Sequence, residues 1–292
     1  MNRRGFLGSA ASLALGACGR SRADTGLWRD LDFAPEPGAW EGQRTLVMAP
    51  EGVQTLPLLV ALHGRGESGR GLEVGARGWR DDYGLERAHA RLRAPPLTRE
   101  DLGGLVRAER LALLNASLST TPYEGLCVAC PYTPELPDRR VEGAQSFARF
   151  LLGRLLPRVR AEVGGAHERA KTGIDGVSMG GRLALLVGLA HPEVFGAVGA
   201  LQPALRAEDA EMLLALARAA MERAAVKLRL VSSEADPFLS AIRVVSHRLQ
   251  AGGVAHELLV VPGSHDYAWN RGPGGAEMLL WHERVQRGLR AP

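Results

Sequence analysis

The 292-residue sequence predicts an α/β protein with a mostly parallel central sheet and helices on both of its faces. Three observations predict this fold class. Apolar runs of strand length recur along the chain, most of them are continuously apolar, and helix-like stretches separate them. Strands buried on both faces have such a composition, and alternation of strands and helices is typical of parallel sheets. We therefore expect a single domain over residues 41–292.

The predicted elements follow one another in a regular order. The expected strands are 44–49, 56–62, 126–130, 171–175, 196–201, 228–233 and 256–261. The expected helices lie at 141–163, 180–190, 207–223 and 238–251. Residues 64–125 interrupt this alternation, because about sixty residues are far more than an ordinary loop needs. Their helix-like pattern predicts a helical insertion over one end of the sheet, where it could shape a substrate pocket.

The N-terminus has the pattern of an export signal. Residues 1–17 begin with Arg3 and Arg4 and continue with an uncharged, mostly apolar run that is too short to span a bilayer. The sequence "RRGFLG" resembles a twin-arginine export signal, and "LGAC" resembles a bacterial lipoprotein box, in which the cysteine, here Cys18, becomes the lipidated first residue. An ordinary cleaved signal with an incidental cysteine is the alternative.

These patterns predict an exported protein of the bacterial cell envelope or periplasm. We expect a membrane contact through a lipid anchor on Cys18, and a tether over residues 18–40, which are rich in glycine, proline and charge. Neither the choice between inner and outer membrane nor the oligomeric state follows from the sequence.

The charge and cysteine content exclude several classes of partner. The chain has 36 basic and 32 acidic residues, and its arginines are scattered among the acids without a basic stripe, so we expect no nucleic-acid partner. Cys127 and Cys130 form a CxxC sequence that could belong to a redox or zinc site. They lie in an apolar strand-like run, however, where residues three apart face opposite sides, and we expect them in the core.

Ser178 is the candidate nucleophile. It stands in "DGVSMGG" between Gly176 and Gly180, after a strand-like run and before a helix-like run. This G-x-S-x-G arrangement is typical of a nucleophile elbow, in which a tight turn exposes the serine at the end of the sheet. Glycines on either side let the strand and the helix pass closely, and Gly181 extends this set of small residues.

A serine needs a base, and the base needs a carboxylate. His265 follows the strand-like run 256–261, at the edge of the sheet where the serine is expected. Asp236 follows the preceding strand and precedes Pro237, whose ring favours a loop there; Glu234 is the reserve candidate. The expected catalytic residues are therefore Ser178, Asp236 and His265, in the chain order of this kind of triad.

Acyl transfer also needs donors for the oxyanion. The expected donors are the backbone N–H groups of Met179 and Arg65, with Gly66 as the second choice for the latter. We expect His63 to brace the glycine-rich loop and not to act in the chemistry. No metal ion and no organic cofactor is implied. Four aromatic residues are candidates for either the pocket wall or the core: Trp79, Tyr83, Tyr267 and Trp269.

The motifs "LHGRGES", "GVSMGG", "EADPF" and "GSHDYAWN" together resemble the α/β-hydrolase superfamily, in its esterase branch with esterase D, feruloyl esterases and polyhydroxyalkanoate depolymerases. This resemblance, over roughly residues 44–290, implies a serine esterase that cleaves small or polymeric carboxylic esters through an acyl-enzyme. A peptidase, thioesterase or acyltransferase using the same triad is one alternative. A non-catalytic, surface-anchored binding protein on a hydrolase fold is another.

Overall fold

A computed structural model describes residues 27–35, 42–50 and 55–292. The predicted export signal, Cys18 and the beginning of the predicted tether lie outside the described residues. The described chain forms an eight-stranded sheet in the order β1-β2-β4-β3-β5-β6-β7-β8. The strands are β1 (Trp28–Phe33), β2 (Gln43–Met48), β3 (Leu58–Leu62), β4 (Cys127–Pro131), β5 (Thr172–Gly176), β6 (Ala197–Leu201), β7 (Lys227–Ala235) and β8 (Glu257–Ser264).

The sheet is parallel from β4 to β8 and antiparallel at the β1–β2 edge. All seven predicted strands are present, and the predicted fold class is confirmed. The structure differs from the predicted tether at Trp28–Phe33, which pairs with β2 as the edge strand β1. Trp28, Leu31 and Phe33 of this strand are buried, whereas the polar residues between them are partly or fully exposed, so its composition resembled that of a linker.

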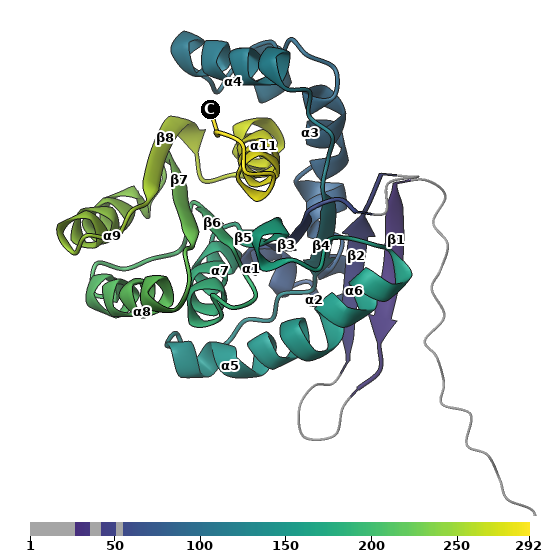
Figure 1. Cartoon of the computed structure of the whole chain (residues 1–292), viewed down its shortest axis with the longest axis vertical. Coiled ribbons are helices and arrows are strands. Elements are labelled where there is room, and N and C mark those ends of the chain that lie inside the picture. The colour runs from purple at the N-terminus through teal and green to yellow at the C-terminus, as the bar shows by residue number, and fades with distance from the viewer. Residues whose placement is uncertain (1–26, 36–41, 51–54) are drawn as a thin grey trace, which may run out of the picture.

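Helices cover both faces of the sheet (Figure 1). One layer consists of α5 (Val141–Phe150), α6 (Leu156–Glu162), α7 (Met179–Ala190), α8 (Asp209–Arg223) and α9 (Leu239–Ala251). The opposite layer consists mainly of α3 (Leu85–Leu92), α4 (Ala108–Thr120) and α11 (Gly275–Gln286). Short helices complete the chain: α1 (Arg65–Ser68), α2 (Gly71–Gly75), η1 (Gly78–Asp82), η2 (Glu100–Leu102), η3 (Leu151–Leu155), η4 (Arg169–Lys171), α10 (Tyr267–Trp269) and η5 (Asn270–Gly274).

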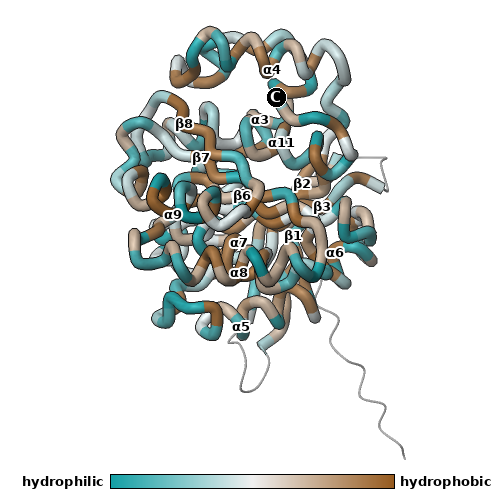
Figure 2. The backbone as a smooth tube through the Cα atoms, turned by 60° about the vertical axis from the view of Figure 1, so that its left-hand side comes forward, coloured by the Kyte–Doolittle hydropathy of each residue, from teal (hydrophilic) through white to brown (hydrophobic). Residues whose placement is uncertain are grey.

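The two helix layers enclose separate hydrophobic clusters, one on each face of the sheet. Neighbouring residues of β3 divide between them, because side chains alternate along a strand: Leu58, Val60 and Leu62 face one cluster, and Leu59 and Ala61 face the other. In Figure 2 the apolar stretches lie along the strands and α7, between more polar outer helices. Burial on both faces explains why most strands are continuously apolar.

The predicted insertion at 64–125 is helical, but it does more than cover one end of the sheet. Together with α11 it builds the second helix layer, and α3 packs directly against α11. Its first part, from Gly64 to Tyr83, also reaches the carboxyl ends of the strands, where it contributes to a pocket. No helix in the described part of the chain is long and apolar enough to cross a membrane.

Cys127 and Cys130 both lie in β4 and are buried as free thiols. Burial raises the pKa of Cys127 to about 12, and it raises the pKa of Cys130 well above its usual value. Neither thiol ionises near neutral pH, so neither is a reactive nucleophile or a metal ligand in this state. The prediction that both pack in the core is confirmed.

Candidate active site

Ser178 occupies the turn between β5 and α7. Its backbone has φ 57° and ψ −115°, a conformation that residues with a side chain rarely adopt. The turn is held by the Ser178 N–H, which donates to the carbonyl of Leu201 on the neighbouring strand at 2.9 Å. The serine side chain is partly exposed. Strained backbone of this kind presents a hydroxyl at the edge of a parallel sheet.

The flanking glycines are required by close backbone contacts. A Cβ atom on Gly180 would lie 2.4 Å from the carbonyl oxygen of Leu62, and one on Gly176 would lie 2.6 Å from the backbone of Gly180. A Cβ atom on Gly181 would lie 2.8 Å from the Gly176 oxygen. All three positions therefore exclude any side chain while α7 crosses β3 and β5 at this distance, as the sequence pattern predicts.

Asp236 and His265 lie together at the carboxyl ends of β7 and β8. The Nδ1–H of His265 donates to Oδ1 of Asp236 at 3.0 Å, and the aspartate side chain is fully buried. The carboxylate also accepts hydrogen bonds from Ser232 Oγ at 2.7 Å and from the Phe238 N–H at 3.0 Å. These bonds fix the carboxylate and leave Nε2 as the acceptor nitrogen of the neutral imidazole.

Glu234, the reserve candidate, is exposed and pairs with Arg107 at the surface. Asp236 is thus the carboxylate that the structure places against His265. Three other histidines after Ser178 are bound elsewhere: His191 to Glu193, His256 to Ser246, and His282 to Asp175. His247 is exposed on α9.

Ser178 and His265 line the same pocket, which has a volume of about 330 Å³. No hydrogen bond joins their side chains in the described structure. A catalytic pair is often loose in the absence of substrate, and it tightens when substrate binds. The pocket therefore brings together the serine and the histidine, which in turn contacts the aspartate.

The expected oxyanion donors lie at the beginnings of two helices. Met179 is the first residue of α7, and Arg65 is the first residue of α1, so neither N–H has an acceptor within its own helix. Gly66 follows Arg65 and lines the same pocket as Ser178. The two helix starts meet at the elbow, since a Cβ atom on Gly64 would lie 3.7 Å from Ser178 Cβ.

His63 braces this loop from beneath. Its Nδ1 bonds to the Gly64 carbonyl at 2.9 Å, and its Nε2 accepts from the Thr133 N–H at 2.8 Å. Burial lowers the pKa of His63 to about 4, so the ring is neutral at physiological pH. A buried neutral ring with both nitrogens bonded to backbone is a structural support, as the sequence analysis expected.

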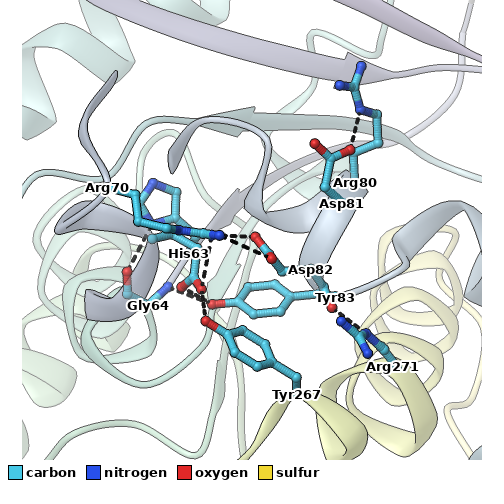
Figure 3. A network of polar contacts seen from close by, with 10 residues as sticks. His63, Gly64, Arg70, Arg80, Asp81, Asp82, Tyr83, Tyr267 and Arg271 are labelled. Atoms are coloured by element: carbon cyan, nitrogen blue, oxygen red, sulfur yellow. Dashed lines mark hydrogen bonds and ion pairs between the residues drawn. The ribbon is translucent and has the colours of Figure 1, made fainter. Parts of the chain in front are cut away.

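Glu67 joins the loop to the histidine segment. It is buried, and its carboxylate accepts hydrogen bonds from the hydroxyls of Tyr83 and, at 2.7 Å, of Tyr267. The two hydroxyls lie side by side beside the positively charged Arg70 (Figure 3). Tyr83 Oη also accepts from the Gly64 N–H at 3.1 Å. This cluster fixes the expected oxyanion loop relative to the segment that carries His265.

Two residues of this neighbourhood were missed in the sequence. Glu67 looks like an ordinary polar residue of a loop, and its partners lie far away along the chain. Gln202 has φ 42° and is buried after β6, where its Nε2 donates to the Ser264 carbonyl at 2.9 Å, next to His265. In the sequence, a glutamate in a loop and a glutamine after a strand are only weak indications of a functional site.

Of the four aromatic candidates, Tyr83 and Tyr267 line the pocket and Trp79 and Trp269 pack in the core.

The sheet order, the helices on both faces and the strand–serine–helix turn define an α/β-hydrolase fold. A family model described as "Putative esterase" matches residues 130–271, slightly less than half of the chain. That stretch includes Ser178, Asp236 and His265. A comparison with curated proteins finds no match.

Solved structures share this fold at low sequence identity. The S-formylglutathione hydrolase of Staphylococcus aureus is 16% identical with a TM-score of 0.58, and the match covers 89% of this chain and 96% of that one. A fluorophosphonate-binding serine hydrolase of that species is 17% identical with a TM-score of 0.59, over 90% and 96% of the chains. A ferulic acid esterase of Anaeromyces mucronatus is 15% identical with a TM-score of 0.55, over 89% of each chain.

At these identities the structural likeness establishes the fold, and the family model adds the chemistry. The family model over residues 130–271 supports a carboxylic ester hydrolase. The expected resemblance to esterases is confirmed at this level.

Proposed function

We propose that the protein is a serine esterase that cleaves carboxylic esters through an acyl-enzyme, with Ser178, His265 and Asp236 as its triad. One observation carries this proposal: Ser178 in the elbow shares a pocket with His265, and Nδ1 of His265 is hydrogen-bonded to the buried Asp236. This is the arrangement that activates a serine hydroxyl, in the chain order typical of α/β-hydrolases.

In the first half of the reaction, Ser178 Oγ attacks the ester carbonyl carbon while His265 Nε2 takes the serine proton. The histidine then returns this proton to the departing alkoxide, and the alcohol leaves. In the second half, His265 takes a proton from water, the hydroxide attacks the acyl-enzyme, and the proton returns to Ser178. Asp236 holds the imidazole in the required tautomer and stabilises its charged form.

The tetrahedral oxyanion would be bound by the N–H groups of Met179 and Arg65, with Gly66 as the second choice beside Arg65. The positions of these groups at helix N-termini support this assignment, because such N–H groups point outward and carry partial positive charge. Glu67 would keep Arg65 in place through its contacts with Tyr83 and Tyr267.

Two kinds of alternative function remain: another enzyme that uses the same triad, and a binding protein that has no activity. A peptidase, thioesterase or acyltransferase would differ in substrate. In a binding protein without activity, we would expect the serine to be covered. Ser178 is instead partly exposed and lines two pockets. Its accessibility supports the enzyme.

We further propose export through residues 1–17 and lipid anchoring on Cys18. This proposal rests on the sequence pattern alone. The intact mass of the exported protein tests it, because cleavage before Cys18 with an added lipid is the expected result, and an unmodified N-terminus would contradict it.

The esterase proposal is tested by comparing wild type with Ser178→Ala on 4-nitrophenyl acetate and butyrate. We expect the variant to lose at least about 1,000-fold in kcat while circular dichroism and thermal unfolding stay close to wild type, because the nucleophile is removed without new contacts. Full activity in a folded variant would refute the assignment of Ser178.

A further inference from the structure

A second pocket of about 410 Å³ lies on the other side of Ser178. Its wall carries an unusual excess of positive charge. Four arginines line it, against a single carboxylate, that of Glu135; the arginines are Arg65, Arg139, Arg182 and Arg206. This charge directly borders the serine, so it acts on whatever part of the substrate enters the pocket.

Arg182 is a buried arginine without an ion pair among the described residues. It lies one turn after Ser178 on α7, and only 3% of its surface is exposed. Its Nη1 donates to the Arg139 carbonyl, whereas its buried Nε has no hydrogen-bond partner. No ion pair joins Arg182 to a carboxylate in the described part of the chain.

Arg182 remains charged at neutral pH. Burial, followed by the nearby Arg139, lowers its pKa to about 10. Asp209 and Asp138 offset part of this effect, but neither forms an ion pair with Arg182. A buried guanidinium without a direct ion pair is costly, and leaving one of its donors unbonded adds to the cost. An anionic ligand in the pocket would supply the missing negative charge.

Within the described residues, the other three arginines have no strong ion pair that would prevent them from contacting an anionic ligand. Arg139 Nη2 donates to the Ala204 carbonyl at 2.9 Å but lies 3.6 Å from Asp209, and Arg206 Nη1 lies 3.6 Å from Glu208, so neither carboxylate is within hydrogen-bond distance. Arg65 pairs with Glu135 at 2.8 Å, but both of these side chains are largely exposed. Exposed pairs of this kind are worth little, so they exchange readily for a ligand carboxylate.

The position of His265 indicates which pocket holds the alcohol part of an ester and which holds the acyl part. His265 lines the first pocket and not the arginine-lined one. Since His265 must protonate the departing alkoxide, the alcohol leaves on the side of the first pocket. The arginine-lined pocket then faces the acyl group.

We propose that the arginine-lined pocket binds a carboxylate carried by the acyl group of the substrate. The preferred substrates would then be half-esters of dicarboxylic acids, whose free carboxylate fits the planar fork of a guanidinium. This inference rests on the proposed esterase function and names the substrate class of that same site.

The test compares kcat/KM for mono-4-nitrophenyl succinate and glutarate with that for the neutral 4-nitrophenyl pentanoate. We expect a preference of about tenfold to a hundredfold for the anionic esters, which is the value of one hydrogen bond to a charged group. The preference should fall as sodium chloride is raised.

Variants tie this preference to the pocket. Arg206 is exposed, so Arg206→Ala should fold normally and reduce the ratio of anionic to neutral kcat/KM by several-fold; Arg182→Gln should reduce it further. The control Arg243→Ala removes the same charge from an exposed site on α9 that does not line the pocket, and should leave the ratio unchanged.

A second pair of esters locates the anion. 4-Acetoxybenzoate and its neutral methyl ester carry the difference in charge on the alcohol, and we expect no preference between them beyond about twofold. A strong preference here would overturn the assignment to the acyl side. If neutral esters are cleaved by Ser178 but anionic acyl esters are not preferred, this inference fails and the esterase stands. If Ser178→Ala remains active, the esterase proposal fails as well.

Discussion

The Asp236 side chain is held in one orientation by its neighbours. It is fully buried, and it accepts hydrogen bonds from Ser232, Phe238 and His265. The His265 ring also packs edge-on against Phe238, with 5.4 Å between the ring centroids. These contacts leave the imidazole little freedom to rotate, so its orientation is set before substrate arrives.

Asp236→Asn tests this role. An amide oxygen in the Oδ1 position can still accept from Phe238 and His265, but the amide has no negative charge to stabilise the imidazolium that forms during catalysis. We expect kcat for 4-nitrophenyl butyrate to fall by about four orders of magnitude with little change in KM. Glu234→Gln is the matched control, since Glu234 is exposed and pairs with Arg107, and it should keep near wild-type kcat. Equal losses in both variants would contradict the assignment.

At the scale of helices and strands, the sequence predicts the fold best where apolar runs mark buried strands and where glycines mark close backbone contacts. The continuous apolar runs predicted seven strands, and the glycine spacing around Ser178 predicted the elbow that joins β5 to α7. The edge strand β1 was missed because it is short, and its exposed Arg29 and Asp32 interrupt the apolar pattern of its buried residues. Edge strands depend on a partner that local sequence does not reveal.

Gly180→Ala tests the crossing of α7 over β3. The new methyl group would lie 2.4 Å from the Leu62 carbonyl oxygen, so the helix must shift. We expect the free energy of unfolding in urea to drop by about 2–4 kcal/mol, together with most of the esterase activity.

Gly153→Ala is the control for this substitution. It lies in the helical segment η3 with nothing within 4 Å of the added Cβ atom, so it should be neutral or slightly stabilising. If Gly180→Ala were as stable and as active as this control, the packing explanation of the elbow glycines would be wrong.

At the scale of the whole molecule, the site depends on segments that meet only in the folded chain. The triad candidates could be predicted because each stands just after a strand, and parallel strands end at one edge of the sheet. Glu67 could not, because its partners Tyr83 and Tyr267 belong to the insertion and to the segment after β8. The arginine-lined pocket was likewise hidden, since its residues come from five separate stretches of the sequence.

The buried histidines predict how stability depends on pH. Burial lowers the pKa values of His63 and His89 to about 4, below their usual value of 6.5. Between pH 6.5 and 4 the unfolded chain therefore binds protons that the native protein does not, so the free energy of unfolding falls as the pH falls. His63 alone contributes on the order of 3 kcal/mol, and the effect levels off above pH 6.5.

Urea unfolding at pH 7.5, 6.5, 5.5 and 4.5 measures this dependence. His89→Gln removes one of the two titrating rings, so its stability should depend less steeply on pH than that of wild type. A free energy of unfolding that stays constant from pH 6.5 to 4.5 would contradict the neutral, buried state of both rings.

The central claim is that Ser178 is an activated nucleophile. The most direct measurement is to treat the purified protein with a fluorophosphonate probe and to locate the label by peptide mass spectrometry. We predict one label on Ser178 that is absent from Ser178→Ala and strongly slowed in Asp236→Asn. A folded protein that takes no label, or takes it on another residue, would contradict the account.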